Sequence, residues 1–241
     1  MRYFYCICGL AVLLAVMFSR VEADSFPEMA YFPEGEFEMG SSDEEGKFNE
    51  HPRHNVYLDA FYINRYEVTF KDFEKYLAVN PKQHPTITGW YDRKARPDMV
   101  NKPIFGLQWK RCRKYCEWNN KRLPTEAEWE VAAQGASKHK ANLDWRNFNT
   151  VPVDAYPGSD SNFGCRQMLG NVWEWTGTTF QSYPGFTPDP YKEYSQPLFK
   201  QTKVLKGGCW ATRSRFIRNT YRNYYAPDRR DVWSGFRTCA L

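Results

Sequence analysis

The sequence predicts a loop-rich α+β domain, and three observations lead to that expectation. Helical hydrophobic patterns occupy the chain between residues 69 and 133, whereas short strand patterns dominate after residue 135. Gly and Pro occur 15 times each, so we expect short elements joined by ordered loops. Aromatic residues make up 17% of the chain and include 9 Trp, which is typical of a core built from large rings.

The first 23 residues have the pattern of an export signal. Arg2 precedes an apolar run over residues 7–18. The small residues Val21 and Ala23 follow it, third and first before a candidate cleavage point. The run is shorter than the roughly 20 residues that a membrane-spanning helix needs. We therefore expect cleavage after Ala23, one domain over residues 24–241, no stable membrane span, and a periplasmic or secreted protein. An uncleaved anchor is the alternative.

An odd number of cysteines remains after the predicted cleavage: Cys112, Cys116, Cys165, Cys209 and Cys239. In an oxidising compartment these could form at most two disulfides and would leave one thiol unpaired. Cys112 and Cys116 share one helix face, so we expect each to pair elsewhere. Cys209 could be the unpaired thiol, although a disulfide or a buried position is the expected outcome.

Residues 60–66 favour a strand, and two helices should follow. The first begins at Thr69, with Asp72 near its start and an apolar face formed by Phe73, Tyr76 and Leu77. The second spans residues 109–118 and places Cys112, Tyr115 and Cys116 inward.

A third helix should begin after Thr125. Thr125 and Glu128 have the spacing of a capping box, Trp129 lies on the apolar face, and Gly135 can end the helix. Acidic residues at the start of this helix suit the positive end of the helix dipole. We interpret them as caps rather than catalytic groups.

The remaining chain should contain turns and short strands. Alternation around two tryptophans predicts a strand over residues 172–176, and further strands are expected near residues 203–206 and 234–238. A Pro-rich stretch over residues 184–197 predicts a loop. We find no internal repeat and no second domain in this pattern.

Motifs along most of the chain resemble the formylglycine-generating-enzyme (sulfatase-modifying-factor) superfamily. They occur in this order: GEFEMG at 35–40, EHPRH at 50–54, FYI at 61–63, YEVT at 66–69, KRLPTEAEWE at 121–130, MLGNVWEW at 168–175, KGG at 206–208 and GFR at 235–237. The resemblance implies a C-type-lectin-like α+β fold. It also implies a ligand cleft built largely from the C-terminal segment.

The resemblance also identifies a departure from the family's chemistry. Members that make formylglycine carry two cysteines at positions that correspond to Thr212 and Ile217 here. Neither residue can form a thiolate, so neither can bind copper or form a mixed disulfide with a substrate cysteine. Cys209 alone cannot supply the pair. We therefore do not expect formylglycine generation.

The segment over residues 204–230 resembles the last domain of iron-dependent sulfoxide synthases of the ergothioneine type. In those enzymes histidines of a separate helical domain hold the iron. This chain has only 4 His and does not supply such a domain, so neither iron nor copper is supported by its ligands. His51 and His54 have metal-ligand spacing but lack a third ligand, and a structural role is the expectation.

Residues 213–237 contain seven arginines, two aspartates and several aromatic residues. Guanidinium groups bind carboxylates and phosphates and stack on rings, which favours a small anionic or aromatic ligand. The alternative, equally weighted, is that these arginines tie loops to the core. A local basic run in an exported chain argues against nucleic acid. The candidate ligand-binding residues are Cys209, Trp210, Thr212, Arg213, Arg218, Tyr221, Arg222 and Tyr224. We expect Arg213, Arg218 and Arg222 to face the cleft.

The resemblance further implies a calcium site at the turn around residues 170–174. Gly170 and Val172 would supply carbonyl oxygens and Glu174 a carboxylate, which are the hard ligands that calcium requires. Gln167 stands where the family has Asn, and a structural turn is the alternative. A second family calcium site should be lost between residues 147 and 151.

We interpret the chain as an exported accessory, maturation or small-ligand-binding protein without formylglycine chemistry. Its partner would be the small ligand above or a protein in the same compartment. One alternative is a periplasmic oxidoreductase, because some family members oxidise chromophores without the cysteine pair. Another is a diversified ligand-display protein, because C-terminal segments of this fold also serve as variable binding surfaces.

Overall fold

The structure is a computed structural model that describes residues 28–42, 44, 46–83, 90–91, 94–188 and 190–241. The expected signal peptide and its cleavage point lie outside these residues. The strands are β1 (Met29–Phe32), β2 (Gly35–Met39), β3 (His54–Leu58), β4 (Phe61–Asn64), β5 (Trp90–Tyr91), β6 (Lys94–Ala95), β7 (Lys121–Arg122), β8 (Trp173–Thr179), β9 (Lys203–Lys206), β10 (Asn223–Tyr225), β11 (Ser234–Gly235) and β12 (Cys239–Ala240). The α-helices are α2 (Phe70–Val79), α3 (Trp109–Trp118) and α4 (Glu126–Ala132). Short 3-10 turns are η1 (Phe48–Glu50), η2 (Pro81–Gln83), η3 (Lys138–Lys140), η4 (Pro157–Ser159), η5 (Lys192–Tyr194), η6 (Gln196–Leu198) and η7 (Ser214–Phe216).

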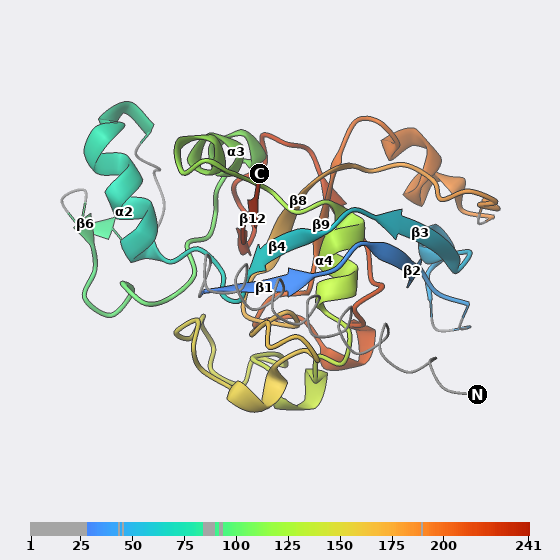
Figure 1. Cartoon of the computed structure of the whole chain (residues 1–241), viewed down its shortest axis with the longest axis horizontal. Helices are drawn as coiled ribbons and strands as arrows, with labels where there is room; N and C mark the ends of the chain where they lie inside the picture. Colours follow the sequence, from blue (N-terminus) through green and yellow to red (C-terminus); the bar gives the residue numbers. More distant parts are fainter. Residues whose placement is uncertain (1–27, 43, 45, 84–89, 92–93, 189) are drawn as a thin grey trace, which may run out of the picture.

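Two four-stranded sheets form the centre of the domain. One has the strand order β1-β4-β12-β7 and the other β10-β9-β8-β11. A two-stranded ribbon of β2 and β3 extends from one end of the molecule, and α2 lies at the opposite end (Figure 1). Few helices, many short strands and long connections confirm the α+β class.

The three predicted helices are confirmed. Helix α2 begins after Thr69, whose hydroxyl accepts the backbone N–H of Asp72 at 3.1 Å. Helix α3 occupies the predicted residues, and its two cysteines and Tyr115 are buried. Helix α4 begins with the expected capping box, in which the Thr125 hydroxyl accepts the backbone N–H of Glu128 at 3.2 Å.

The strand expected over residues 234–238 is instead divided between the two sheets. Strand β11 pairs in parallel with β8, whereas β12 inserts between β4 and β7 of the other sheet. Phe236 and Arg237 lie in the crossing segment and are completely buried. The sequence predicts one strand here because a local pattern does not show which sheet each residue joins.

Helix α4 packs between the sheets and the β2–β3 ribbon. It contacts β2, β3, β8 and β9, and Trp129 at its centre is completely buried. The indole Nε1 of Trp129 donates to Glu174 in β8 at 2.9 Å. The helix therefore brings its acidic first turn into the interior, where it meets basic residues of the C-terminal half.

The expectation of disulfides is corrected by the structure. Cys112, Cys116, Cys165, Cys209 and Cys239 are all free and buried. Burial raises the pKa of the Cys112 and Cys239 thiols well above its ordinary value. These thiols contribute to the packed core as small apolar groups.

Within the part of the chain that the structure describes, no helix combines the length and apolar character required to cross a bilayer.

Candidate functional site

Arg237 lies in the crossing segment and acts as a structural tie. Its Nε and Nη2 donate to the two oxygens of Glu174 at 2.7 Å, and neither side chain is exposed. Nη1 donates to the backbone carbonyls of residues 64 and 65, and Nη2 also donates to that of residue 166. A buried charge of this kind is stable only when it is paired and hydrogen-bonded. This arginine thus links both sheets and cannot meet a ligand.

Arg222 does not face a cleft, which corrects the expected orientation of its side chain. Its side chain is 1% exposed. Nε and Nη2 donate to both oxygens of Glu126 at 2.6 and 2.9 Å, and the backbone carbonyls of Asn49 and Gln181 accept further bonds. The guanidinium also lies 4.0 Å from the ring centroid of Tyr183. Arg222 is therefore fully engaged as a tie between α4 and the neighbouring loops.

The acids at the start of α4 are more than helix caps. Glu130 accepts a bond from Lys206 at 2.8 Å and one from the backbone N–H of Gly40 at 2.7 Å. Burial alone would raise the pKa of Glu126, but the charges of Arg222 and Lys206 outweigh it and lower that pKa. Glu126, Glu130, Lys206 and Arg222 form one buried cluster, which we call the α4 ion network.

Arg218 and Arg213 have different environments at the start of the basic segment. Arg218 donates to both oxygens of Glu50 at 3.0 and 3.1 Å, and its side chain is 16% exposed. The Nε of Arg218 is buried and donates no hydrogen bond to another described residue. Arg213 is exposed and forms no ion pair within the described residues. Of the three expected cleft arginines, Arg213 is thus the one available to a ligand as the chain stands.

Thr212 and Ile217 occupy the positions where formylglycine-generating relatives have cysteines. The Thr212 hydroxyl accepts the backbone N–H of Cys209 at 3.0 Å and lies 3.4 Å from its sulfur. Ile217 is completely buried, and its side chain packs against Gly208. Burial raises the pKa of Cys209 despite the hydrogen bond from Thr212. The turn holds one buried thiol and no second one beside it.

Aromatic side chains and Arg213 gather at the surface beside this turn. The backbone N–H of Trp145 donates to the carbonyl of Trp210 at 3.0 Å, and their rings meet edge to face at 5.0 Å. Trp145 and Phe148 are 41% and 76% exposed, and Phe216 is 51% exposed. We call Trp145, Phe148, Trp210, Arg213 and Phe216 the aromatic–arginine surface.

The loop that carries Trp145 has an unusual backbone. Asp144, Trp145 and Phe148 all have positive φ, at 60°, 62° and 50°. Each such non-glycine residue costs on the order of 1 kcal/mol, and such conformations concentrate at functional sites. The Asp144 carboxylate accepts the backbone N–H of Ser214 at 2.9 Å, which holds the loop against the basic segment. Trp210 adds a buried indole Nε1 without a hydrogen-bond partner among the described residues.

The two candidate tyrosines are placed differently. Tyr221 is partly buried, lies beneath the ammonium group of Lys47, and has its ring centroid 5.8 Å from that of Trp173. Tyr224 belongs to β10, and its ring stacks on Phe180 at 4.0 Å. Tyr221 is near the expected cleft, whereas Tyr224 packs β10 against Phe180, the residue that follows β8.

The turn considered for calcium fits an ion pair better than a cation. Both oxygens of Glu174 accept bonds from Arg237, and one also accepts the Trp129 indole N–H. A guanidinium in this position opposes a divalent cation. Gln167, which precedes Gly170 and Val172 in sequence, has a buried side-chain oxygen that accepts no hydrogen bond from the described residues. Among the described residues, no group of three or more His, Cys, Asp or Glu is arranged to hold a metal.

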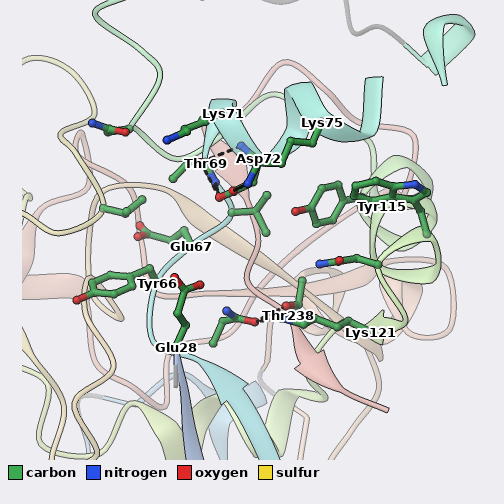
Figure 2. A pocket seen from close by; sticks show the side chains of 16 residues that line it. Glu28, Tyr66, Glu67, Thr69, Lys71, Asp72, Lys75, Tyr115, Lys121 and Thr238 are labelled. Atoms are coloured by element: carbon green, nitrogen blue, oxygen red, sulfur yellow. Dashed lines mark hydrogen bonds and ion pairs between the residues drawn. The ribbon is translucent and has the colours of Figure 1, made fainter. Parts of the chain in front are cut away.

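The structure also contains a pocket that the sequence did not reveal. It has a volume of about 470 Å³ and lies between the start of α2, α3 and the end of β4 (Figure 2). Glu67 lines it and is 2% exposed. One Glu67 oxygen accepts a hydrogen bond from Asn171 at 3.1 Å, but no described residue reaches the buried Oε2. Burial raises the pKa of Glu67 to about 8, despite the nearby charge of Arg237.

The signal that could have identified this pocket is the position of Glu67 itself. It stands between a strand and the cap of α2, in a run where its neighbours Val68 and Phe70 are buried. An acid at a buried position is informative because carboxylates rarely lose all contact with water without a reason. The expected ligand-binding residues all lie between positions 209 and 224 and do not include Glu67.

Comparisons with known proteins identify the family of this chain. Residues 15–240 match the family described as "Sulfatase-modifying factor enzyme 1-like domain". The chain is 32% identical over 234 residues to hercynine oxygenase of Mycolicibacterium smegmatis, covering 78% of this chain and 55% of that protein. It is 27% identical to the inactive C-alpha-formylglycine-generating enzyme 2 of Mus musculus, covering 89% of this chain and 85% of the relative. This chain thus spans about half the length of hercynine oxygenase.

Among solved structures, PvdO from Pseudomonas aeruginosa superposes with a TM-score of 0.70. The two share 25% sequence identity, and the match covers 88% of this chain and 93% of PvdO. CarF superposes with a TM-score of 0.61 at 18% identity, which supports the fold alone. These likenesses confirm the expected fold, that of the formylglycine-generating-enzyme type.

Proposed function

Because this chain belongs to the sulfatase-modifying-factor family, we propose that it binds a small anionic, aromatic ligand without performing formylglycine chemistry. The ligand would contact the aromatic–arginine surface. The observation that carries the proposal is that exposed Trp145 lies on a loop held against the segment of exposed Arg213, because the Asp144 carboxylate accepts the backbone N–H of Ser214. Arg213 forms no ion pair within the described residues, although its charge, together with the stronger hydrogen bonds from Ser214, lowers the pKa of Asp144. An exported accessory or maturation role, with this ligand or a protein of the same compartment as partner, is part of the proposal.

The chemistry of the surface favours a flat anion. Trp145 offers a large ring held by the edge of Trp210, and a guanidinium can pair with a carboxylate or stack on a ring. The ring of Trp233 lies 5.2 Å from that of Trp210 and extends the array inward. Rigid aromatic groups contribute contact area at a low entropic cost, which is why they commonly anchor ligands.

The fate of the other arginines sharpens this assignment. Arg222 and Arg237 are consumed by buried acids, and Arg218 is paired with Glu50. Arg213 and Arg215 at the beginning of the segment are exposed, and the Arg215 guanidinium lies 4.6 Å from the ring centroid of Phe216. The arginines of the segment therefore have two roles, and we assign its exposed beginning to the ligand. The absence of a thiol at Thr212 and Ile217 supports binding rather than copper-dependent oxidation of a cysteine.

An oxidoreductase is the second candidate. The similarity to hercynine oxygenase favours it, because the name of that relative denotes an oxygenase. The similarity covers about half of that relative, so the activity of the whole protein is not transferred to this chain. The residues of this chain would then form only the substrate-facing wall, with the metal ligands supplied by another domain or protein.

Titration calorimetry with indole-3-acetate tests the binding proposal. We expect saturable binding that weakens at high salt, and weaker binding of the uncharged analogue indole-3-ethanol. Arg213→Ala and Trp145→Ala should each reduce affinity by about tenfold, the equivalent of 1.4 kcal/mol. Lys114→Ala, an exposed lysine on α3, is the matched control and should have no effect.

Equal affinity for the charged and uncharged probes, or no effect of either variant, would contradict the proposal. A parallel incubation with a sulfatase-type cysteine peptide and copper should yield no aldehyde by mass spectrometry. Conversion of that peptide would show that formylglycine can be generated without cysteines at positions 212 and 217.

A further inference from the structure

The pocket beside α2 has a lining of balanced charge. It contains three acids, three lysines and three asparagines: Glu28, Glu67, Asp72, Lys71, Lys75, Lys121, Asn64, Asn101 and Asn119. Figure 2 shows Lys71, Asp72 and Lys75 on one side of the pocket and Glu28, Thr238 and Lys121 on the other. Opposite charges are interspersed in this wall, because Asp72 pairs with Lys75 and the carboxylate of Glu28 acts on the charge of Lys121, so neither sign is concentrated in one place.

Several of these charges are already neutralised within the protein. Asp72 pairs with Lys75 at 3.0 Å, and the ammonium group of Lys121 donates to the Asn64 side chain at 2.9 Å. The side chains of Asn101 and Asn119 form no hydrogen bond with other described residues. The polar groups left for a ligand are therefore mainly neutral amides, which can both donate and accept.

Glu67 adds a buried polar atom that lacks a partner. Glu67 is one of the lining residues, and no hydrogen bond from the described residues reaches its buried Oε2. A buried polar atom without a partner is unfavourable, so the Glu67 carboxyl group is incompletely satisfied as it stands. A hydroxyl group satisfies this oxygen in either protonation state of the acid, since a hydroxyl donates as well as accepts.

Aromatic side chains form the remaining wall. Tyr66, Tyr115 and Trp118 line the pocket, and Trp118 is 40% exposed. The Trp118 ring is held by Tyr115, with ring centroids 5.7 Å apart, and by Tyr76, at 5.5 Å. A ring fixed in this way offers a flat apolar face to the C–H groups of a polar molecule.

We propose that this pocket binds a small neutral polyhydroxylated molecule, a monosaccharide or a cyclitol, whose hydroxyls contact Glu67 and the asparagine amides while one face lies against Trp118. The volume of about 470 Å³ accommodates a six-membered ring with ordered water. Balanced charge, free amides, the orphaned acid oxygen and the aromatic wall each select for such a ligand. The site lies on α2 and α3 and is separate from the aromatic–arginine surface.

Saturation-transfer NMR on the full chain tests this proposal. The probes are D-glucose, D-galactose, D-mannose and myo-inositol, with D-glucosamine and D-gluconate as charged analogues. We expect transfer to at least one neutral probe and about fivefold weaker binding of both charged analogues, because each would bury an unpaired charge. Failure of all four neutral probes, or tighter binding of a charged analogue, would overturn the proposal.

Three variants and one control localise the binding. Trp118→Ala should weaken the best neutral probe by about tenfold, the equivalent of 1.4 kcal/mol, and its partial exposure makes a folded variant the expectation. Glu67→Gln keeps a donor and an acceptor and should change affinity less than threefold, whereas Glu67→Ala should resemble Trp118→Ala. Trp145→Ala should leave sugar binding unchanged. Loss of sugar binding in Trp145→Ala, or its retention in both Trp118→Ala and Glu67→Ala, would place the ligand elsewhere and reject this site.

Discussion

The α4 ion network and the pocket around Glu67 both bury carboxylates, yet they differ in how completely those carboxylates are satisfied. In the network, Glu126 and Glu130 accept hydrogen bonds from Arg222, Lys206 and the backbone, and the pKa of Glu126 is lowered. In the pocket, one Glu67 oxygen accepts a hydrogen bond from Asn171, and the other receives none from the described residues. The comparison distinguishes buried carboxylates that stabilise the fold through ion pairs from a buried carboxyl group that still has an oxygen available to a ligand.

The difference also appears in the pKa values of the two acids. Glu126 is completely buried, but two cations hold its pKa below the ordinary value. Glu67 is equally buried, and its pKa rises to about 8 because burial outweighs the opposing charge of Arg237, which is paired with Glu174. A second cation close to Glu67 would have made it another structural tie.

The largest expected effect comes from breaking the ion network. Arg222→Met should lower the free energy of unfolding by about 3–5 kcal/mol, because it removes both hydrogen bonds of the guanidinium to Glu126 and leaves this buried acid with one cation shared with Glu130. Lys206 lies 3.9 Å from Glu126 and already pairs with Glu130. Urea denaturation measures the loss, and the double variant Arg222→Met with Glu126→Leu should recover part of it. A single variant within 1 kcal/mol of the parent chain would show that the network is not needed for stability.

A smaller, pH-dependent effect is expected for Glu67→Gln. The folded pKa of Glu67, about 8, lies above its ordinary value of 4.5, so the folded state retains a proton that the unfolded state releases. The stability of the parent chain should therefore fall as pH rises from 4.5 to 8 and change no further through this group.

Glutamine mimics the protonated acid and removes this slope. The variant should match the parent near pH 4 and exceed it in free energy of unfolding by about 4 kcal/mol at pH 8. Chemical denaturation of both proteins across this range gives the difference directly, so contributions from other acids cancel. A constant difference at all pH values would mean that Glu67 is ionised in the folded protein.

The smallest effect separates the helix cap from the ion network. Thr125→Ala should cost only about 1 kcal/mol, because it removes one cap hydrogen bond and leaves the paired acids in place. Trp129→Ala in the same helix is the comparison and should cost about 3–5 kcal/mol as a core truncation. If denaturation ranked the two in the opposite order, the cap and not the interior contacts would hold α4.

Local signals predicted much of the fold. The caps at Thr69 and Thr125 and the apolar faces of α2 and α3 depend on residues within a few positions of one another, and all were confirmed. The division of residues 234–240 between two sheets depends on β4, β7 and β8, far along the chain. No local pattern records such a pairing.

The site was less predictable for a related reason. Seven arginines in one segment indicate that acids or ligands must meet them, but not which ones. Arg222 and Arg237 find Glu126 and Glu174 in elements of other chain regions, so their fate is a property of the fold. The sequence shows Glu67 only as part of the motif at residues 66–69. A single acid does not indicate a pocket whose walls come from separate segments of the chain.

Strand β12 has a consequence for how the chain assembles. It occupies the middle of the first sheet, between β4 and β7, although it follows every other described element in sequence. That sheet has a gap at its centre until residues 239–240 arrive, and Arg237 seals the neighbouring interior only in the same step. Pairing across such sequence distances is slow. During synthesis on the ribosome, the N-terminal half must therefore wait in an unfinished state, and a chain interrupted before β11 would expose the apolar faces of both sheets.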